Sequence, residues 1–213
     1  MGCSDGWIGT TYIGEPTPQP KDQVREMHRM LVESGEGWGE ESTAEFLGPH
    51  DLAKVGREGS YGIAILAKRR AERTERMIYR PIDEGREGRG AIACKFGRFW
   101  AVFTHLQHDP TGYEQEVQAE ELLAWIWSGL GCVNVVLGGD FNGVPSFGAA
   151  RLMERAMGEG KAGRATFPIT CIGGIRLDYL FVHGRSIERV GRNRVLHTDT
   201  ASDHYPMCCS FRC

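Results

Sequence analysis

The segment that most clearly indicates the fold is Val133-Asn134-Val135-Val136-Leu137-Gly138-Gly139-Asp140-Phe141-Asn142. Its first five residues are apolar and valine-rich except for Asn134, which is typical of an interior β-strand, and two glycines follow. In an extended chain, Asp140 and Asn142 project to one face while Phe141 packs on the other. The segment therefore predicts a buried strand that ends in polar side chains.

Two further polar clusters follow in the second half of the chain. Residues 176–182 alternate as a strand does, so Arg176 and Asp178 are expected on one side of it. A carboxylate inside a buried strand needs a partner, because an isolated buried charge is costly. Asp203 and His204 follow a polar stretch, which predicts a loop that directs side chains into a cleft. Together the clusters predict a phosphate-cleaving metal site.

These clusters resemble motifs of the endonuclease/exonuclease/phosphatase superfamily, which includes deoxyribonuclease I and exonuclease III-type abasic-site endonucleases. The matching residues are Gly-Asp-Phe-Asn at 139–142, Arg-x-Asp-Tyr at 176–179 and Ser-Asp-His at 202–204. Two weaker elements precede them in family order: the strand Gly62-Ile63-Ala64-Ile65-Leu66 and the strand end Thr104-His105-Leu106. Gln118-Ala119, in a predicted helix, also has a family counterpart. The resemblance covers about residues 60–212.

The resemblance implies a four-layer α/β sandwich, in which two packed mixed β-sheets are flanked by helices. It implies a single domain over residues 1–213, with a divergent N-terminal part at 1–60. The residue pattern alone supports only an α plus β class. It predicts helices at 21–33, 114–130 and 147–157, and a hairpin formed by strands at 91–95 and 99–105. A basic connection at 68–76 is expected directly after the Gly62 strand.

The resemblance also implies a role for each residue of the site. Asp178 orients His204, whose imidazole contacts the scissile phosphate or accepts a proton from water. Asp140 aligns or deprotonates the attacking water, and Asn142 holds a phosphate oxygen. His105 stabilises the transition state or assists the leaving group. In-line attack with inversion at phosphorus is the implied outcome.

A divalent cation, Mg²⁺ or Mn²⁺, is the implied cofactor, with Asp203 as one ligand. The family's Leu-Gln-Glu, whose glutamate binds the metal, is missing from this chain. Glu15, after the strand-like Thr11-Tyr12-Ile13, is the candidate second ligand. Two interpretations stay open: a degenerate first ligand, or a chain that is truncated at its N-terminus and inactive. Arg176 is a candidate phosphate contact, with a structural ion pair to an aspartate as the alternative.

Each assignment has a purely structural alternative. Asp140 and Asn142 are residue types that favour turns, and Asp203 could cap a turn. His105 and His204 could be core histidines with satisfied hydrogen bonds. The colinear order of the motifs favours a functional site over these alternatives.

The net charge and the distribution of basic residues bear on which substrates and partners the protein could bind. The net charge of −3 gives no global attraction to nucleic acid, so backbone binding would need a local patch. Lys68–Arg76 is one candidate, and a solvated surface segment is the alternative. A phosphodiester of DNA or RNA is the leading substrate. The alternatives are small phosphoesters such as phosphoinositides, or a catalytically defective relative that binds a phosphate-bearing partner.

Cysteine usage and hydropathy indicate the compartment. The seven cysteines are an odd number without Cys-x-x-Cys spacing, which disfavours a zinc site and favours a reducing compartment. No apolar stretch approaches the roughly 20 residues that span a bilayer. We therefore expect a cytoplasmic, monomeric protein.

Overall fold

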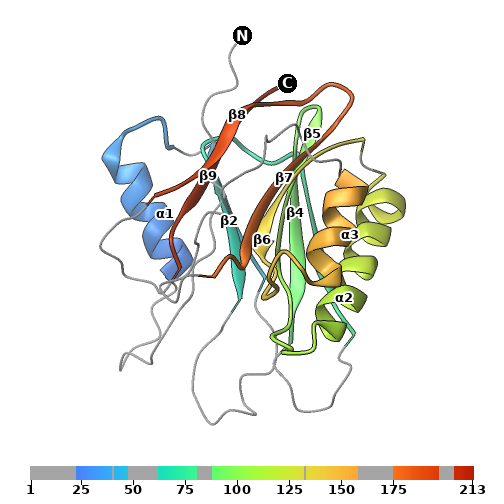
Figure 1. Cartoon of the computed structure of the whole chain (residues 1–213). Coiled ribbons are helices and arrows are strands. Elements are labelled where there is room, and N and C mark those ends of the chain that lie inside the picture. The colour runs from blue at the N-terminus through green and yellow to red at the C-terminus, as the bar shows by residue number, and fades with distance from the viewer. Residues whose placement is uncertain are drawn as a thin grey trace, which may run out of the picture.

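The computed structural model describes residues 23–39, 41–47, 62–80, 88–131, 133–157, 175–196 and 204–213. These residues form four layers (Figure 1). Helix α1 (Gln23–Ser34) is outermost on one side. A five-stranded sheet lies in the interior, and helices α2 (Tyr113–Ala124) and α3 (Gly148–Met157) cover its far face. The predicted layered α/β sandwich is confirmed.

The layer between α1 and the large sheet consists of two small antiparallel pairs. Strand β1 (Thr43–Leu47) pairs with β2 (Ile63–Ala67). Strand β8 (Glu188–Val195) pairs with β9 (Met207–Arg212). Within the described residues this layer is therefore divided into two parts.

The large sheet has the strand order β3-β4-β5-β6-β7. Its strands are β3 (Arg73–Ile78), β4 (Gly90–Phe96), β5 (Phe99–His105), β6 (Asn134–Asp140) and β7 (Asp178–Gly184). Strands β5 and β6 run parallel, and the other neighbours are antiparallel. The predicted hairpin between β4 and β5 is confirmed, and Gly97 takes the left-handed conformation that its turn requires, with φ 59°.

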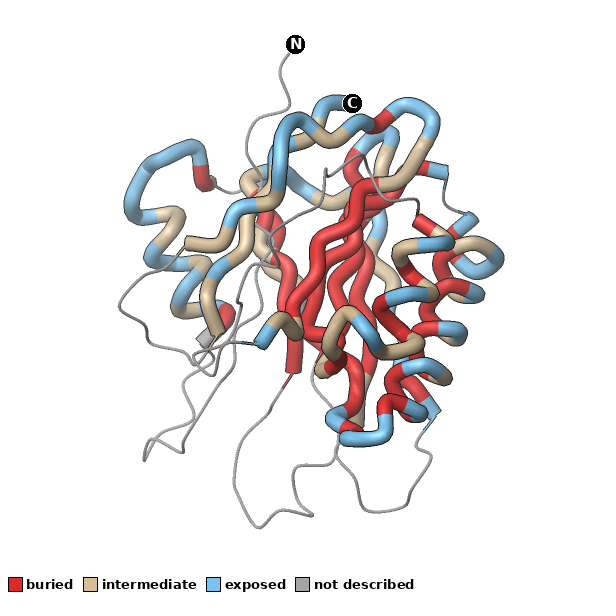
Figure 2. The backbone as a smooth tube through the Cα atoms, in the orientation of Figure 1, coloured by how far each residue is buried: buried red, intermediate tan, exposed pale blue. Residues whose placement is uncertain are grey.

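The face of the large sheet toward α2 and α3 holds the largest apolar cluster. Figure 2 shows strands β4 to β7 buried along most of their length. Phe141 is fully buried there, with its ring centre 5.2 Å from that of Tyr179 and 5.8 Å from that of Phe181. Leu122 of α2 and Met153 of α3 complete this core. The apolar side chains that hold α2 and α3 on the sheet thus belong to residues such as Phe141 and Tyr179, which alternate in sequence with the polar residues Asp140 and Asp178.

The opposite face of the large sheet packs on the two small pairs. Ile63 and Ile65 of β2 lie against Ile92 and Phe103. Val136, Val182 and Ile187 form a separate cluster with side chains of β9. Arg189 and Asn193 of β8 donate hydrogen bonds of 2.9 and 3.1 Å to the Leu180 carbonyl, so this backbone oxygen of the edge strand β7 is satisfied by side chains.

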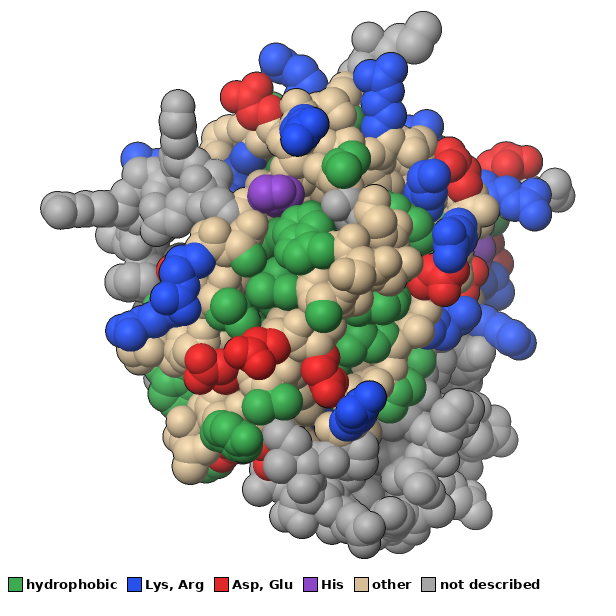
Figure 3. All heavy atoms as spheres, turned by 90° about the vertical axis from the view of Figure 1, so that its right-hand side faces the viewer, with side chains coloured by type: hydrophobic (Ala, Val, Ile, Leu, Met, Phe, Trp, Pro, Cys, Tyr) green, Lys and Arg blue, Asp and Glu red, His purple; other side chains and the backbone are tan. Residues whose placement is uncertain are grey.

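The outer face of α2 and α3 is mixed in character. Figure 3 shows an apolar patch in the middle of this face, with acidic and basic side chains around it. Trp125, Trp127 and Leu152 are partly buried apolar residues packed on the core beneath. None of the helices among the described residues is long and apolar enough to cross a membrane. The described part of this face does not have the one-sign basic character typical of nucleic-acid surfaces.

The predicted helices are confirmed, with one change of geometry. The segment predicted as one helix at 114–130 consists of α2 followed by one π-helical turn, η2 (Trp125–Gly129). The Leu130 amide donates to the Trp125 carbonyl at 2.9 Å, which is the five-residue spacing of a π turn.

The basic connection predicted at 68–76 is wrong in part, because β3 begins at Arg73. Among the residues that the structure describes, this edge strand has a hydrogen-bonded neighbour on one side only. Its residues are exposed or partly exposed, and no apolar alternation marks it. Arg73 pairs with Glu75 of the same strand, and Arg76 pairs with Glu45 of β1. These ion pairs favour the interpretation of the segment as ordinary charged surface.

Candidate active site

The register of the large sheet places one residue of each strand in a single row. Ile78 pairs with Gly90, Gly90 with His105, His105 with Asp140, and Asp140 with Asp178. Directly paired residues point to the same face of a sheet, and the neighbours of this row, such as Phe141 and Tyr179, pack on the helix face. His105, Asp140 and Asp178 therefore lie side by side on the face away from α2 and α3.

His204 completes this group from the loop that precedes β9. Its Nδ1 lies 2.8 Å from Asp178 Oδ2, and its Nε2 lies 3.9 Å from Asp140 Oδ2. Leu196 and Pro206, on either side of it in the chain, are joined by a backbone hydrogen bond of 2.8 Å. The carboxylate of Asp178 thus fixes the imidazole so that its second nitrogen is directed toward Asp140.

Asp140 is a buried carboxylate that faces both histidines. Its Oδ1 accepts a hydrogen bond of 2.8 Å from the backbone N–H of Asn142, and its Oδ2 lies 3.4 Å from His105 Nε2. Burial and, next, the charge of Asp178 raise the pKa of Asp140 to about 7, against the opposing effects of the Asn142 hydrogen bond and His204. A carboxylate that titrates near neutral pH suits a general base.

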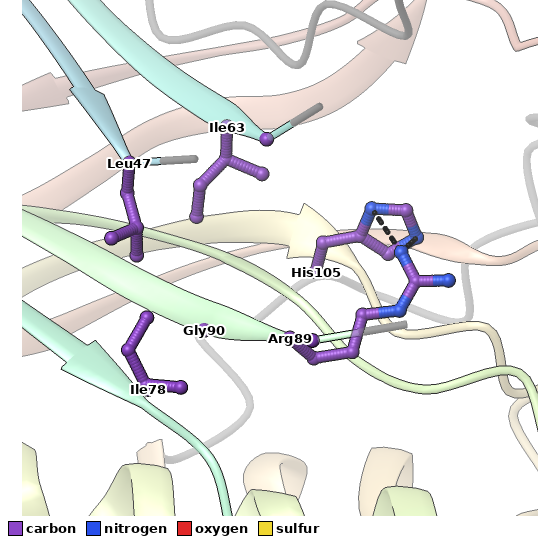
Figure 4. A pocket seen from close by; sticks show the side chains of 8 residues that line it. Leu47, Ile63, Ile78, Arg89, Gly90 and His105 are labelled. Carbon is purple, nitrogen blue, oxygen red and sulfur yellow. Dashed lines mark hydrogen bonds between the residues drawn. The ribbon is translucent and has the colours of Figure 1, made fainter. Parts of the chain in front are cut away.

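Arg89 is the functional side chain that the sequence did not single out. Its Nη1 lies 3.1 Å from both ring nitrogens of His105, so the guanidinium lies against the imidazole (Figure 4). Its Nε donates to Gln107 Oε1 at 3.2 Å. Burial, and then the charge of Arg89, lower the pKa of His105 well below its usual range. His105 is therefore neutral at pH 7. Arg89 directly precedes β4, and the pairing of Gly90 with His105 explains its position beside the imidazole.

Asn142 is held by contacts on both its side chain and its backbone. Its Nδ2 donates to His105 Nε2 at 3.0 Å and to the Leu106 carbonyl at 2.9 Å. Its backbone is left-handed, with φ 47°, and its carbonyl accepts a hydrogen bond of 2.9 Å from Gln115 of α2. For Asn142 to hold a phosphate oxygen, one of the two Nδ2 bonds has to be exchanged for it. That role stays a prediction.

Arg176 lies elsewhere than the alternation predicts. Strand β7 begins only at Asp178, and the Arg176 guanidinium lies 4.3 Å from the centre of the Tyr179 ring. Tyr179 belongs to the core on the helix face, so Arg176 does not share a side with the Asp178 carboxylate. Its Nε is 3.5 Å from the Asp178 backbone oxygen. A substrate contact by Arg176 stays a prediction.

The two predicted metal ligands, Asp203 and Glu15, lie outside the described residues. Among the residues that the structure describes, Asp140, Asp178 and His204 offer ligand atoms that all lie within 4.8 Å of one another. Carboxylate oxygens are the ligands that Mg²⁺ and Mn²⁺ prefer, and an imidazole suits Mn²⁺. The donor chemistry at this end of the sheet therefore fits a divalent cation of this class.

Comparison with known proteins places the chain in a family. Residues 18–204 match the family model described as the Endonuclease/Exonuclease/phosphatase family. The chain belongs to this family. Its members are phosphoester hydrolases. No curated protein matches the chain.

Solved structures of this family have the same fold. The chain is 17% identical to the endonuclease/exonuclease/phosphatase from Beutenbergia cavernae, with a TM-score of 0.68 over 93% of this chain and 60% of that one. The chain is 17% identical to the endonuclease/exonuclease/phosphatase from Bacteroides vulgatus, with a TM-score of 0.62 over 91% of this chain and 81% of that one. It is 16% identical to the human Nocturnin catalytic domain, solved with a bound sulfate anion, with a TM-score of 0.61 over 91% of this chain and 88% of that one. At these identities the likeness concerns the fold alone.

Proposed function

We propose that this protein hydrolyses phosphodiester bonds with Mg²⁺ or Mn²⁺, and that its substrate is nucleic acid, DNA or RNA. The observation that carries the proposal is the row of His105, Asp140 and Asp178 across three strands, with His204 bonded to Asp178. Hydrolysis of a phosphodiester requires an oriented water, neutralisation of charge on the phosphate oxygens and help for the leaving oxygen. The residues of this row match those needs.

Asp140 is the residue that orients and activates the attacking water in this proposal. With a pKa raised to about 7 by burial and by Asp178, its carboxylate takes a proton from water more readily than an ordinary aspartate does. The Asn142 amide holds Oδ1, which leaves Oδ2 turned toward the two imidazoles. A water between Oδ2 and the phosphorus atom would attack in line with the leaving oxygen.

The other needs are met around the phosphate. Asp178 holds Nδ1 of His204, so that Nε2 is the atom that meets a phosphate oxygen. His105 is neutral, and Arg89 against its ring supplies a fixed positive charge. In our proposal Asp203 and Glu15 would hold a divalent cation, which would supply charge neutralisation at the phosphate oxygens. The donor group of Asp140, Asp178 and His204 fits the same class of ion.

A second candidate function is phosphate binding without catalysis. The missing Leu-Gln-Glu favours it, because one metal ligand of the family pattern then depends on Glu15. A phosphatase for small phosphoesters such as phosphoinositides is the further alternative. All three predict phosphate at the same row and differ in what is cleaved.

The test is hydrolysis by the full chain with Mg²⁺, Mn²⁺ or EDTA. The substrates are supercoiled plasmid, single-stranded RNA, bis(p-nitrophenyl) phosphate and a soluble phosphoinositide. We expect metal-dependent cleavage of plasmid or RNA that EDTA and His204→Ala abolish. Release of phosphate from the phosphoinositide alone would move the substrate to small phosphoesters. If no diester is cleaved with either ion, the protein is a binding module and the proposal is wrong.

Glu15→Gln tests the proposed second ligand separately. If Glu15 binds the cation, the variant needs at least about tenfold more Mg²⁺ for half-maximal activity, because one anionic ligand is lost. An unchanged Mg²⁺ requirement removes Glu15 from the metal site and leaves the enzyme proposal standing.

A further inference from the structure

The strand pair β8–β9 carries a strong excess of positive charge. Residues 185–195 and 207–212, which include this pair and the turn before it, contain five arginines and one glutamate, a net charge of +4 in a chain whose net charge is −3. A cluster of one sign attracts polyanions even when the net charge of the protein does not. The arginines of this cluster are Arg185, Arg189, Arg192, Arg194 and Arg212.

The register shows which side chains lie on the outer face of the pair. Phe211 and Cys209 of β9 pack on the large sheet. Cys208 and Arg212 alternate with them and therefore point outward. Arg194 is the cross-strand partner of Cys208, so it points outward as well. Figure 2 shows β8 and β9 as exposed or intermediate, which means that the described chain leaves this outer face open.

An irregularity of β8 brings Arg192 onto the same face. The strand has a β-bulge between Val190 and Arg194. Within it, Asn193 is turned inward, since its Nδ2 donates to the Leu180 carbonyl at 3.1 Å. Arg192 and Arg194, on either side of Asn193 in the chain, are both exposed. The bulge thus presents two guanidinium groups side by side on the outer face.

These two arginines lack the compensation found in the other basic segment. In β3, Arg73 and Arg76 are paired with glutamates. Among the residues that the structure describes, no carboxylate forms an ion pair with Arg192 or Arg194. Glu188, the one acid of the strand pair, lies at the other end of β8. The charge of Arg192 and Arg194 is therefore available to an anion from solution.

The two arginines lie at the end of the strand pair that faces the active site. The pair starts shortly after His204, where Leu196 and Pro206 share a backbone hydrogen bond of 2.8 Å, and Arg194 pairs with Cys208. Cys208 is four residues after His204, so at most about 14 Å of extended chain separates them. The phosphates of one DNA strand are spaced about 3.4 Å apart along the helix axis. A nucleic-acid strand held at His204 therefore reaches these arginines within a few nucleotides.

We propose that the outer face of β8–β9, with Arg192 and Arg194 as its main contacts, binds the phosphate backbone of a nucleic-acid strand beside the bond that is cleaved. The inference rests on the proposed function, because it takes the scissile phosphate to lie at His204. Guanidinium groups suit this partner, since they bind phosphate through two parallel hydrogen bonds. An anionic membrane fits less well. Segments that bind membrane surfaces combine cations with an apolar face, and among the described residues of this pair Val190 is the only large apolar side chain that is exposed.

The test measures binding without cleavage, by fluorescence anisotropy of a labelled single-stranded DNA with the full chain in EDTA. For a strand of roughly 20 nucleotides in about 50 mM NaCl, the dissociation constant of Arg192→Gln/Arg194→Gln should rise at least about tenfold, because two phosphate contacts are lost. The slope of log affinity against log salt should become shallower by about 1.4, since each contact with a single strand contributes about 0.7. Hydrolysis of bis(p-nitrophenyl) phosphate should stay unchanged, because this substrate does not extend to β8.

Arg151→Gln/Arg155→Gln is the matched control. Both residues are exposed on α3, in the layer on the other side of the large sheet, and the variant changes the net charge by the same amount. It should bind the strand as the unaltered protein does. An equal loss of affinity in the two double variants, or the same affinity in all three proteins, would overturn the inference.

Vesicles of phosphatidylcholine and phosphatidylserine test the competing partner. Vesicle binding that requires Arg192 and Arg194, without strand binding, would assign this face to a membrane and overturn the inference. Strand binding that requires them, without hydrolysis of any diester, would confirm the face and refute the proposed catalytic function. Diester hydrolysis with a strand affinity that the substitutions do not change would leave the enzyme proposal standing and refute the face.

Discussion

The two faces of the five-stranded sheet are made of alternate residues of the same strands, and they have different tasks. On the helix face, Phe141 and Tyr179 are almost completely buried in an aromatic cluster. On the other face their chain neighbours Asp140 and Asp178 are a pair of buried carboxylates beside two histidines. Because side chains alternate along a strand, a shift of one residue separates the part that holds the fold from the part that does chemistry.

The largest effect expected on the helix face is that of Phe141→Ala. Removing a buried aromatic ring that packs against Tyr179 and Phe181 should lower the free energy of unfolding by about 3–5 kcal/mol. Urea unfolding followed by tryptophan fluorescence measures the change. The exposed Val133→Ala is the control and should change it by less than about 0.5 kcal/mol. A loss below about 1 kcal/mol for Phe141→Ala would mean that this face does not hold the fold.

The neighbouring substitution, Asp140→Asn, should behave in the opposite way. It removes the proposed general base, and kcat for bis(p-nitrophenyl) phosphate should fall about 100-fold. Stability should not fall, because the substitution removes a buried charge that Asp178 repels. Steady-state kinetics and urea unfolding on the same samples measure both. If Asp140→Asn keeps full activity, or loses as much stability as Phe141→Ala, the two faces of the sheet do not have the different tasks assigned to them.

The pH dependence of stability should differ between the unaltered protein and Asp140→Asn. The pKa of Asp140 is raised in the folded state to about 7, so the folded protein keeps this proton more tightly than the unfolded chain does. Between about pH 4 and about pH 7 the unfolded chain ionises first, and the Asp140 contribution to the free energy of unfolding falls as pH rises, by at most about 1.4 kcal/mol per pH unit. Above that range it stays constant.

Urea unfolding between pH 4 and 8 checks this behaviour. The stability of Asp140→Asn minus that of the unaltered protein should grow from pH 4 to 7 and then level off. A difference that does not vary with pH would show that Asp140 titrates as an ordinary aspartate.

The smallest expected effect comes from Gln115, a side chain of the helix layer that contacts the backbone of a site residue. Gln115 is fully buried on α2, and its Nε2 donates hydrogen bonds of 2.9 Å to the Asn142 and Asp109 carbonyls. Gln115→Met keeps the volume and removes both donors, so Asn142 loses part of its support. We expect kcat to fall about tenfold with KM unchanged. The exposed Glu120→Gln on the same helix is the control, and an unchanged kcat for Gln115→Met would limit Gln115 to packing.

The sequence predicted the residues whose position follows from alternation. Asp140 and Asn142 flank Phe141, and the burial of Phe141 in the helix-side core confirms that pattern. The layered fold followed from the family motifs, and the ends of α3 followed from the local residue pattern. Asp178 could be singled out because a carboxylate in a buried strand requires a partner, and its partner is His204.

Features that depend on where a strand begins or on the absence of an apolar period were not predicted. Arg89 was missed because the first strand of the predicted hairpin was expected to begin at residue 91, whereas β4 begins at Gly90, which pairs with His105 and places Arg89 beside its ring. Strand β3 was missed because an edge strand exposes both faces to some extent and has no apolar period. Arg176 was expected beside Asp178, but β7 begins after it, which frees its side chain to lie on Tyr179.

The central claim is that Asp178 and His204 act as one unit on a phosphodiester, and a double-mutant cycle tests it most directly. The kcat/KM for bis(p-nitrophenyl) phosphate with Mn²⁺ is measured for the unaltered protein, Asp178→Asn, His204→Ala and the double variant. Because the main effect of Asp178 on catalysis is exerted through the imidazole that it holds at 2.8 Å, the two losses should not multiply, and the double variant should be close in rate to His204→Ala alone. If the two losses multiply instead, the carboxylate and the imidazole work independently, and this account of the site is contradicted.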